Sequence, residues 1–112
     1  MSQQATAPHD WATNVRKYVP NADNAAIKGI VRHLGIALRG KDSSFVACTD
    51  KLERDRVRDH FLKKKLGLAL DDAELDRGVA DVCQRMQGDR DKPRVTFYYL
   101  LAEKYGKLSM FT

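Results

Sequence analysis

Three segments of this 112-residue chain end in the same way. They are IVRHLG at 30–35, LKKKLG at 62–67 and LAEKYG at 101–106, and each runs from an apolar residue through cations or a histidine to a glycine. Cations in a last helical turn offset the negative end of the helix dipole, and glycine readily adopts the left-handed conformation that ends a helix. The pattern predicts three helix ends, although apolar spacing continues past the first of them to Leu38.

Apolar spacing and capping residues predict helices throughout the rest of the chain. Side chains that can accept a hydrogen bond from a first helical turn are found at four predicted starts: Asp10, Asp23, Thr49 or Asp50, and Asp71. Glu53 and Glu74 follow two of them at the spacing of a capping box, and Pro93 suits the first turn of a last helix. No strand pattern competes. We expect an all-α fold, a single compact bundle of about five helices over residues 10–112, preceded by a flexible tail at 1–9.

The predicted third helix, from about residue 51, carries apolar residues on two sides. At ~100° per residue, Leu52, Leu62 and Leu66 fall on one side of an α-helix and Val57 and Phe61 on another. The last predicted helix, VTFYYLLAEKY, is apolar on most sides, which is typical of a helix packed from several directions. The C-terminal KLSMFT keeps apolar residues with which to fold back on the core.

The net charge of +5 is unevenly distributed. Residues 51–70 hold seven basic and three acidic side chains, whereas residues 71–91 hold three basic and seven acidic ones. A basic segment followed directly by an acidic one predicts ion pairing, either within one molecule or across a symmetric dimer.

A basic stripe on the predicted third helix is the candidate nucleic-acid site. Arg54, Arg58, Phe61 and Lys65 fall within a ~60° sector of an α-helix. The cations could neutralise phosphates while Phe61 stacks on a base. The competing interpretation is that Phe61 belongs to the core and that the cations face solvent or the acidic fourth helix.

The residue types that usually carry chemistry form no recognised motif. His9, His33 and His60 lack metal-ligand spacing, and no phosphate-binding loop, nucleophile elbow or zinc-protease motif occurs. We therefore expect no catalytic residues, no metal, no cofactor and no small-molecule substrate. The protein is expected to be non-enzymatic.

Two cysteines are too few and too far apart to predict a disulfide framework or a zinc site. Cys83 falls on the apolar stripe of the predicted fourth helix, and Cys48 lies just before a helix start, where positive potential favours a thiolate. Isolated thiols are typical of a reducing compartment. The N-terminal segment also lacks a signal-peptide pattern, and no apolar run reaches the ~20 residues of a membrane span, so we expect a cytoplasmic protein.

Taken together, IVRHLGIALRGKDSSFVACTD, RDHFLKKKLGL and RVTFYYLLAEKYGKL resemble a family of short bacterial proteins catalogued as a domain of unknown function. The resemblance spans about residues 15–111 and implies a small stand-alone bacterial protein, without a reaction, ligand or catalytic residue to transfer. The two-sided apolar third helix and the separation of basic from acidic segments instead favour a function in contact with a protein partner or with a second copy of the chain. Nucleic-acid binding through the basic stripe is the alternative.

Overall fold

The computed structural model describes residues 10–112, and the predicted flexible tail, residues 1–9, lies outside the described residues. The α-helices are α1 (Trp11–Tyr18), α2 (Asn24–Leu34), α3 (Lys51–Arg56), α4 (Asp72–Arg85) and α5 (Arg94–Lys104). The other elements are two 3₁₀ turns, η2 (Gly35–Arg39) and η4 (Leu108–Phe111), a π-helical segment that continues α3, η3 (Val57–Lys65), and two short strands, β1 (Phe45–Val46) and β2 (Lys92–Pro93). The predicted all-α bundle of about five helices is confirmed.

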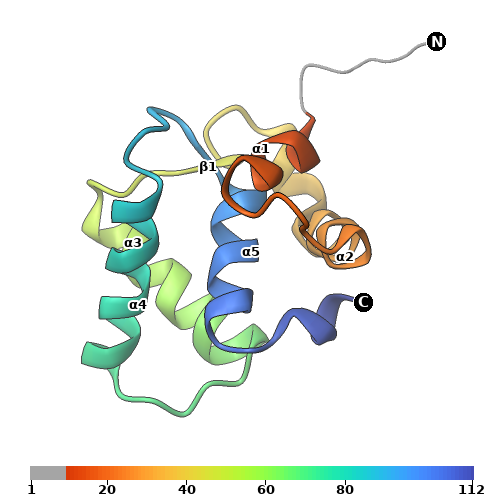
Figure 1. Ribbon diagram of the computed structural model, residues 1–112. Helices are drawn as coiled ribbons and strands as arrows, with labels where there is room; N and C mark the ends of the chain where they lie inside the picture. Colours follow the sequence, from red (N-terminus) through yellow and green to blue (C-terminus); the bar gives the residue numbers. More distant parts are fainter. Residues whose placement is uncertain (1–9) are drawn as a thin grey trace, which may run out of the picture.

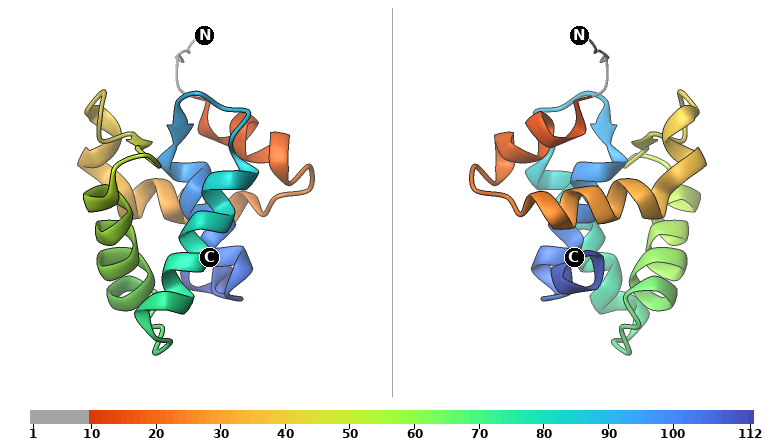
Figure 2. Two further views of the ribbon diagram at one scale, coloured as in Figure 1. Left: turned by 90° about the vertical axis from the view of Figure 1, so that its left-hand side faces the viewer. Right: turned by 90° about the vertical axis from the view of Figure 1, so that its right-hand side faces the viewer.

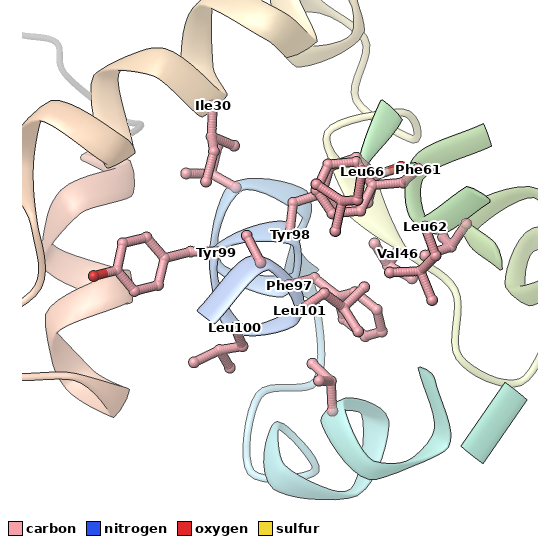
Figure 3. Packing of buried hydrophobic residues seen from close by; sticks show 14 of the residues in the cluster. Ile30, Val46, Phe61, Leu62, Leu66, Phe97, Tyr98, Tyr99, Leu100 and Leu101 are labelled. Carbon is pink, nitrogen blue, oxygen red and sulfur yellow. The ribbon is translucent and has the colours of Figure 1, made fainter. Parts of the chain in front are cut away.

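Helix α5 runs through the middle of the bundle, with the other helices around it (Figure 1). Every residue from Val95 to Ala102 is buried, so no side of this part of the helix faces solvent. Tyr98 and Tyr99 leave it in different directions (Figure 3): Tyr98 stacks on Phe61, with ring centroids 3.8 Å apart, and Tyr99 lies on the opposite side. The prediction of a helix packed from several directions is therefore confirmed.

The helix starts and ends follow the predicted local signals. Asp10, Asp23, Asp50 and Asp71 each accept a hydrogen bond from a backbone N–H of the helix that follows. Gly35, Gly67 and Gly106, the glycines of the three similar segments, have φ values of 48°, 69° and 68°. Helix α2 therefore ends at Leu34, and Leu38 belongs to the separate turn η2.

The predicted register of the third helix is wrong after residue 56. Leu62 and Leu66 are buried, but Leu52 is 64% exposed, because the chain changes from α3 to the π-helical η3 at Val57. A π-helix, with i→i+5 hydrogen bonds, turns less per residue than the ~100° of an α-helix. Residues beyond Val57 therefore fall behind the α-helical register, and Leu52 no longer shares a side with Leu62.

The C-terminal segment folds back on the bundle, as its apolar residues predicted. Phe111, in η4, is 5% exposed. The segment η4 contacts α2, and Figure 2 shows the C-terminal turn beside this helix. The approach is close because Gly29 has no side chain: a Cβ at this position would overlap the backbone carbonyl of Phe111. Gly29 thus permits the close contact between α2 and η4.

A two-stranded antiparallel pair was not expected from the sequence. Phe45 pairs with Pro93 and Val46 with Lys92. Strands of two residues are too short to leave a period-two pattern, so only the fold reveals them. The pair brings the loop before α3 against the start of α5.

Candidate functional site

The structure does not bring the predicted basic stripe together as one open surface. The phenyl ring of Phe61 is 1% exposed and stacks on Tyr98, so neither of its faces is open to a base. Arg54 donates a 2.6 Å hydrogen bond to the carbonyl oxygen of Cys48. The Lys65 ammonium lies 5.5 Å from the centre of the Phe111 ring.

Arg58, the remaining member of the stripe, is held by carboxylates of its own helix and of α4. Its guanidinium donates hydrogen bonds to Asp59 (2.8 Å) and Asp76 (3.1 Å) and lies 3.9 Å from a carboxylate oxygen of Asp72. The hydrogen bond to Asp59 is the largest of the influences that raise the pKa of Arg58 above its ordinary value. Arg58 is therefore shared between Asp59 of η3 and the acidic fourth helix.

Helix α4 pairs with cations on both of its neighbours. Lys63 of η3 forms an ion pair with Asp72, and Lys104 of α5 lies 3.2 Å from Asp81. The predicted pairing between the basic and the acidic segment is thus found within a single molecule. The basic ends of η3 and α5 therefore face different parts of α4, Asp72 at its start and Asp81 in its second half. They do not combine into one cationic surface.

A buried ion pair fixes the loop before α3. Arg94 and Glu53 bind each other, and both side chains are only 12% exposed. Arg94 also donates to the carbonyl oxygens of Ser43 and Phe45, at 2.7 Å and 3.0 Å, and to the hydroxyl of Tyr98 at 3.2 Å. Glu53 thus binds Arg94 and does not accept the hydrogen bond from the Asp50 N–H that the predicted capping box requires. That N–H donates to the carbonyl oxygen of Ala47.

A second polar cluster joins α1 to the loop after α4. The carboxylate of Asp89 accepts hydrogen bonds from Asn14 (3.1 Å), Tyr18 (3.0 Å) and Lys17. Burial alone would raise the pKa of Asp89, but these donors hold it below its ordinary value. Burial, together with the hydrogen bond to Asp89, raises the pKa of Tyr18 to about 12. These hydrogen bonds join two segments of the same molecule, which is typical of a structural role.

The expectation of two free thiols is wrong, because Cys48 and Cys83 form a disulfide with their Cα atoms 5.9 Å apart. The bond links the loop between β1 and α3 to the last turn of α4. No local pattern could predict it, since the two residues are 35 positions apart and meet only when α4 packs beside α3. Both cysteines remain partly exposed.

A pocket of about 460 Å³ opens beside this disulfide. Cys48 forms part of its wall, whereas Cys83 does not. The charged side chains that line the pocket are Lys41, Asp42, Arg90, Asp91 and Lys92. A cavity of this volume suits a small ligand. Its combination of three cations, two carboxylates and a sulfur makes it the candidate site of the described structure, and no sequence motif marked it.

The described residues show neither a metal centre nor a membrane segment. Within residues 10–112, no three histidine, cysteine or acidic side chains are grouped so as to hold a metal ion. No helix in that range has the length and apolar content to cross a membrane.

His33 packs against two aromatic rings. The centroid of its imidazole lies 6.0 Å from that of Phe111 and 6.2 Å from that of Phe61.

Comparison with known proteins identifies a family but not an activity. No curated protein matches the chain significantly. A family model described as "Protein of unknown function (DUF2853)" matches residues 10–109, which include all five α-helices, the disulfide and the pocket. The chain belongs to this family of unknown function.

Proposed function

We propose that this chain is a small, non-enzymatic protein of the bacterial cytoplasm that acts by contacting other proteins. The observation that carries the proposal is Ile36, whose side chain is 80% exposed on η2, a turn without any buried residue. One exposed apolar side chain is ordinary in itself. Ile36, however, lies between Arg32 and Arg39, which are exposed and form no ion pair within residues 10–112. An apolar centre with a charged rim is the usual composition of a protein interface.

The charges around Ile36 favour an acidic protein partner. Several carboxylates of α4 are engaged inside the molecule. Lys28, Arg32 and Arg39 on α2 and η2 are exposed and form no ion pair with another residue of the range 10–112, so they suit a partner's carboxylates. A second copy of the chain would bring the same cations to the interface and meet repulsion at low salt. We therefore rank self-association of the chain after binding to a different, acidic protein.

Nucleic-acid binding through the basic stripe remains a prediction with less support. Phe61 would have to leave the core to stack on a base, and Arg58 would have to release its carboxylates to meet a phosphate. Binding of protein makes neither demand, which is why we place it first.

A photo-crosslinking amino acid at position 36, compared with the same amino acid at position 70, tests the proposal in cells. Leu70 is the matched control because it is also an exposed apolar residue, at 42%, but lies in a loop far from η2 in the sequence. We expect a discrete adduct from position 36 and none from position 70. The mass of the adduct distinguishes a second copy from another protein, and light scattering at low and high salt checks self-association. Equal labelling at both positions, or none at either, would contradict the proposal.

A further inference from the structure

We propose that the Cys48–Cys83 disulfide is a thiol-exchange site and that the adjoining pocket takes a small thiol carrying carboxylate groups, of the glutathione class. The inference is independent of the protein contact proposed for Ile36. It starts from the placement of the bond: one of its two cysteines forms the wall of a 460 Å³ pocket and is partly exposed.

Access distinguishes the two cysteines. A thiolate must approach a disulfide sulfur to react with it, so exposure determines which bonds exchange. Cys48 belongs to the pocket wall and Cys83 does not, so a thiol bound in the pocket is directed to Cys48. Exchange in the cell depends on the cytoplasmic location proposed above: disulfides in that compartment are usually transient and sense redox conditions, which fits a bond that is open to small thiols.

The pocket charges select the kind of thiol. Lys41 and Arg90 are exposed, line the pocket, and form no ion pair within the described part of the chain. Lys92 lies beside them and donates a 2.9 Å hydrogen bond to the carbonyl oxygen of Asp89. Three cations around a cavity favour a ligand with carboxylates, while Asp42 and Asp91 could meet its ammonium group. A zwitterionic peptide thiol carries both kinds of group.

The exchange proceeds in two balanced steps. The ligand thiolate attacks the sulfur of Cys48, so that a ligand–Cys48 disulfide forms as the Cys48–Cys83 bond breaks, and the electron pair leaves on Cys83, which takes a proton from water. A second ligand thiolate then attacks the ligand sulfur of the mixed disulfide and releases Cys48 as a thiolate. Two ligand thiols are oxidised to one disulfide, and the protein disulfide is reduced to two thiols. Arg54, bound to the carbonyl oxygen of Cys48, keeps a positive charge near this site.

The first measurement compares two reductants acting on the oxidised protein. Glutathione carries carboxylates, whereas 2-mercaptoethanol is neutral, so the ratio of their rate constants reports the contribution of pocket charge. We expect the double substitution Lys41→Ala and Arg90→Ala to lower that ratio about threefold or more. Lys64→Ala, which removes an exposed cation of η3 outside the pocket, should leave the ratio unchanged. An unchanged ratio in the double variant, or two free thiols after oxidation of the wild-type protein, would overturn the proposal.

The second measurement locates the attack. Cys83→Ser leaves Cys48 without its partner, so oxidised glutathione should convert it to a stable mixed disulfide that intact-mass analysis detects. Cys48→Ser, which leaves only Cys83, should react more slowly under the same conditions. Faster labelling of Cys83 would show that the pocket does not direct the thiol. If circular dichroism shows that Cys83→Ser or Cys48→Ser is unfolded, the first measurement decides the question. It compares the glutathione to 2-mercaptoethanol rate ratio of the wild-type protein with that of the Lys41→Ala, Arg90→Ala double variant.

Discussion

Gly29 shows how much of this fold depends on the absence of a single methyl group. Its position on α2 lies against the backbone of Phe111, and a backbone carbonyl cannot move aside as a flexible side chain can. Gly29→Ala should therefore lower the free energy of unfolding by about 1–3 kcal/mol, the range for overpacked sites. Urea unfolding followed by circular dichroism measures the change.

Gly88→Ala is the control for this substitution. No atom lies within 4 Å of a Cβ built at Gly88, and its φ is not positive. It should change the unfolding free energy by no more than about 0.5 kcal/mol. Equal effects at Gly29 and Gly88 would mean that η4 does not pack on α2 as described.

Single residues were predictable where a local rule governs them. An aspartate before an apolar run predicts a helix start, and a glycine after cations predicts a helix end. Both signals lie within a few positions of the sequence, so the caps and the three positive-φ glycines could be predicted. The partner of Cys48 could not, because a bond across 35 residues depends on how two helices pack. The same limit applies to the pocket, whose wall combines residues 41–42 and 45–49 with residues 90–92.

At the scale of an element, η3 marks where sequence periodicity fails. Counting in steps of ~100° is valid only while the hydrogen bonds run i→i+4, and nothing in VRDHFLKKK signals the change to i→i+5. The ~100° step on which the predicted stripe was drawn therefore does not hold beyond Val57. In the structure Phe61 is buried, Arg54 binds the carbonyl oxygen of Cys48, and Arg58 binds carboxylates. The alternative interpretation, with Phe61 in the core and the cations facing the acidic helix, describes Phe61 and Arg58.

Two leucines test the π-helical register directly. Leu62 is fully buried, so Leu62→Ala should lower the unfolding free energy by about 2–5 kcal/mol through lost burial and a cavity. Leu52 is 64% exposed, and Leu52→Ala should change it by no more than about 0.5 kcal/mol. A continuous α-helix through residue 66 would bring both leucines to one side and make the two losses similar. Chemical denaturation of the two variants distinguishes these registers.

At the scale of the whole molecule, charge is used to join elements. Arg58 and Lys63 link η3 to α4, and Lys104 links α5 to α4. Asp89 links the loop after α4 to α1. The separation of basic and acidic segments in the sequence predicted such pairing without giving the partners. Because the acidic helix is largely engaged inside the molecule, the outer surface of α2 and η2 remains positive.

This arrangement makes stability sensitive to acid. Hydrogen-bond donors hold the pKa values of a set of carboxyl groups below their ordinary value of 3.8: Asp10, Asp55, Asp59 and Asp89. The pKa of His33 is likewise lowered from 6.5, first by burial and then by the charge of Lys65. Where the native pKa is the lower one, the unfolded chain binds protons more readily, and stability falls as the pH falls. All five groups therefore act in the same direction.

Asp89 is the group in this set on which the pH dependence can be tested most cleanly, because its side chain is only 13% exposed. Its contribution should be complete above the ordinary carboxyl pKa and disappear as the pH falls through its lower native pKa. Asp89→Asn should therefore lower the unfolding free energy by about 1–3 kcal/mol at pH 7, and by progressively less between about pH 4 and pH 2. Asp91→Asn is the control, since Asp91 is exposed and forms no ion pair within residues 10–112. Urea titrations across this pH range would contradict the assignment if the Asp89→Asn curve ran parallel to wild type at every pH, because the lost stability would then owe nothing to the charge of Asp89.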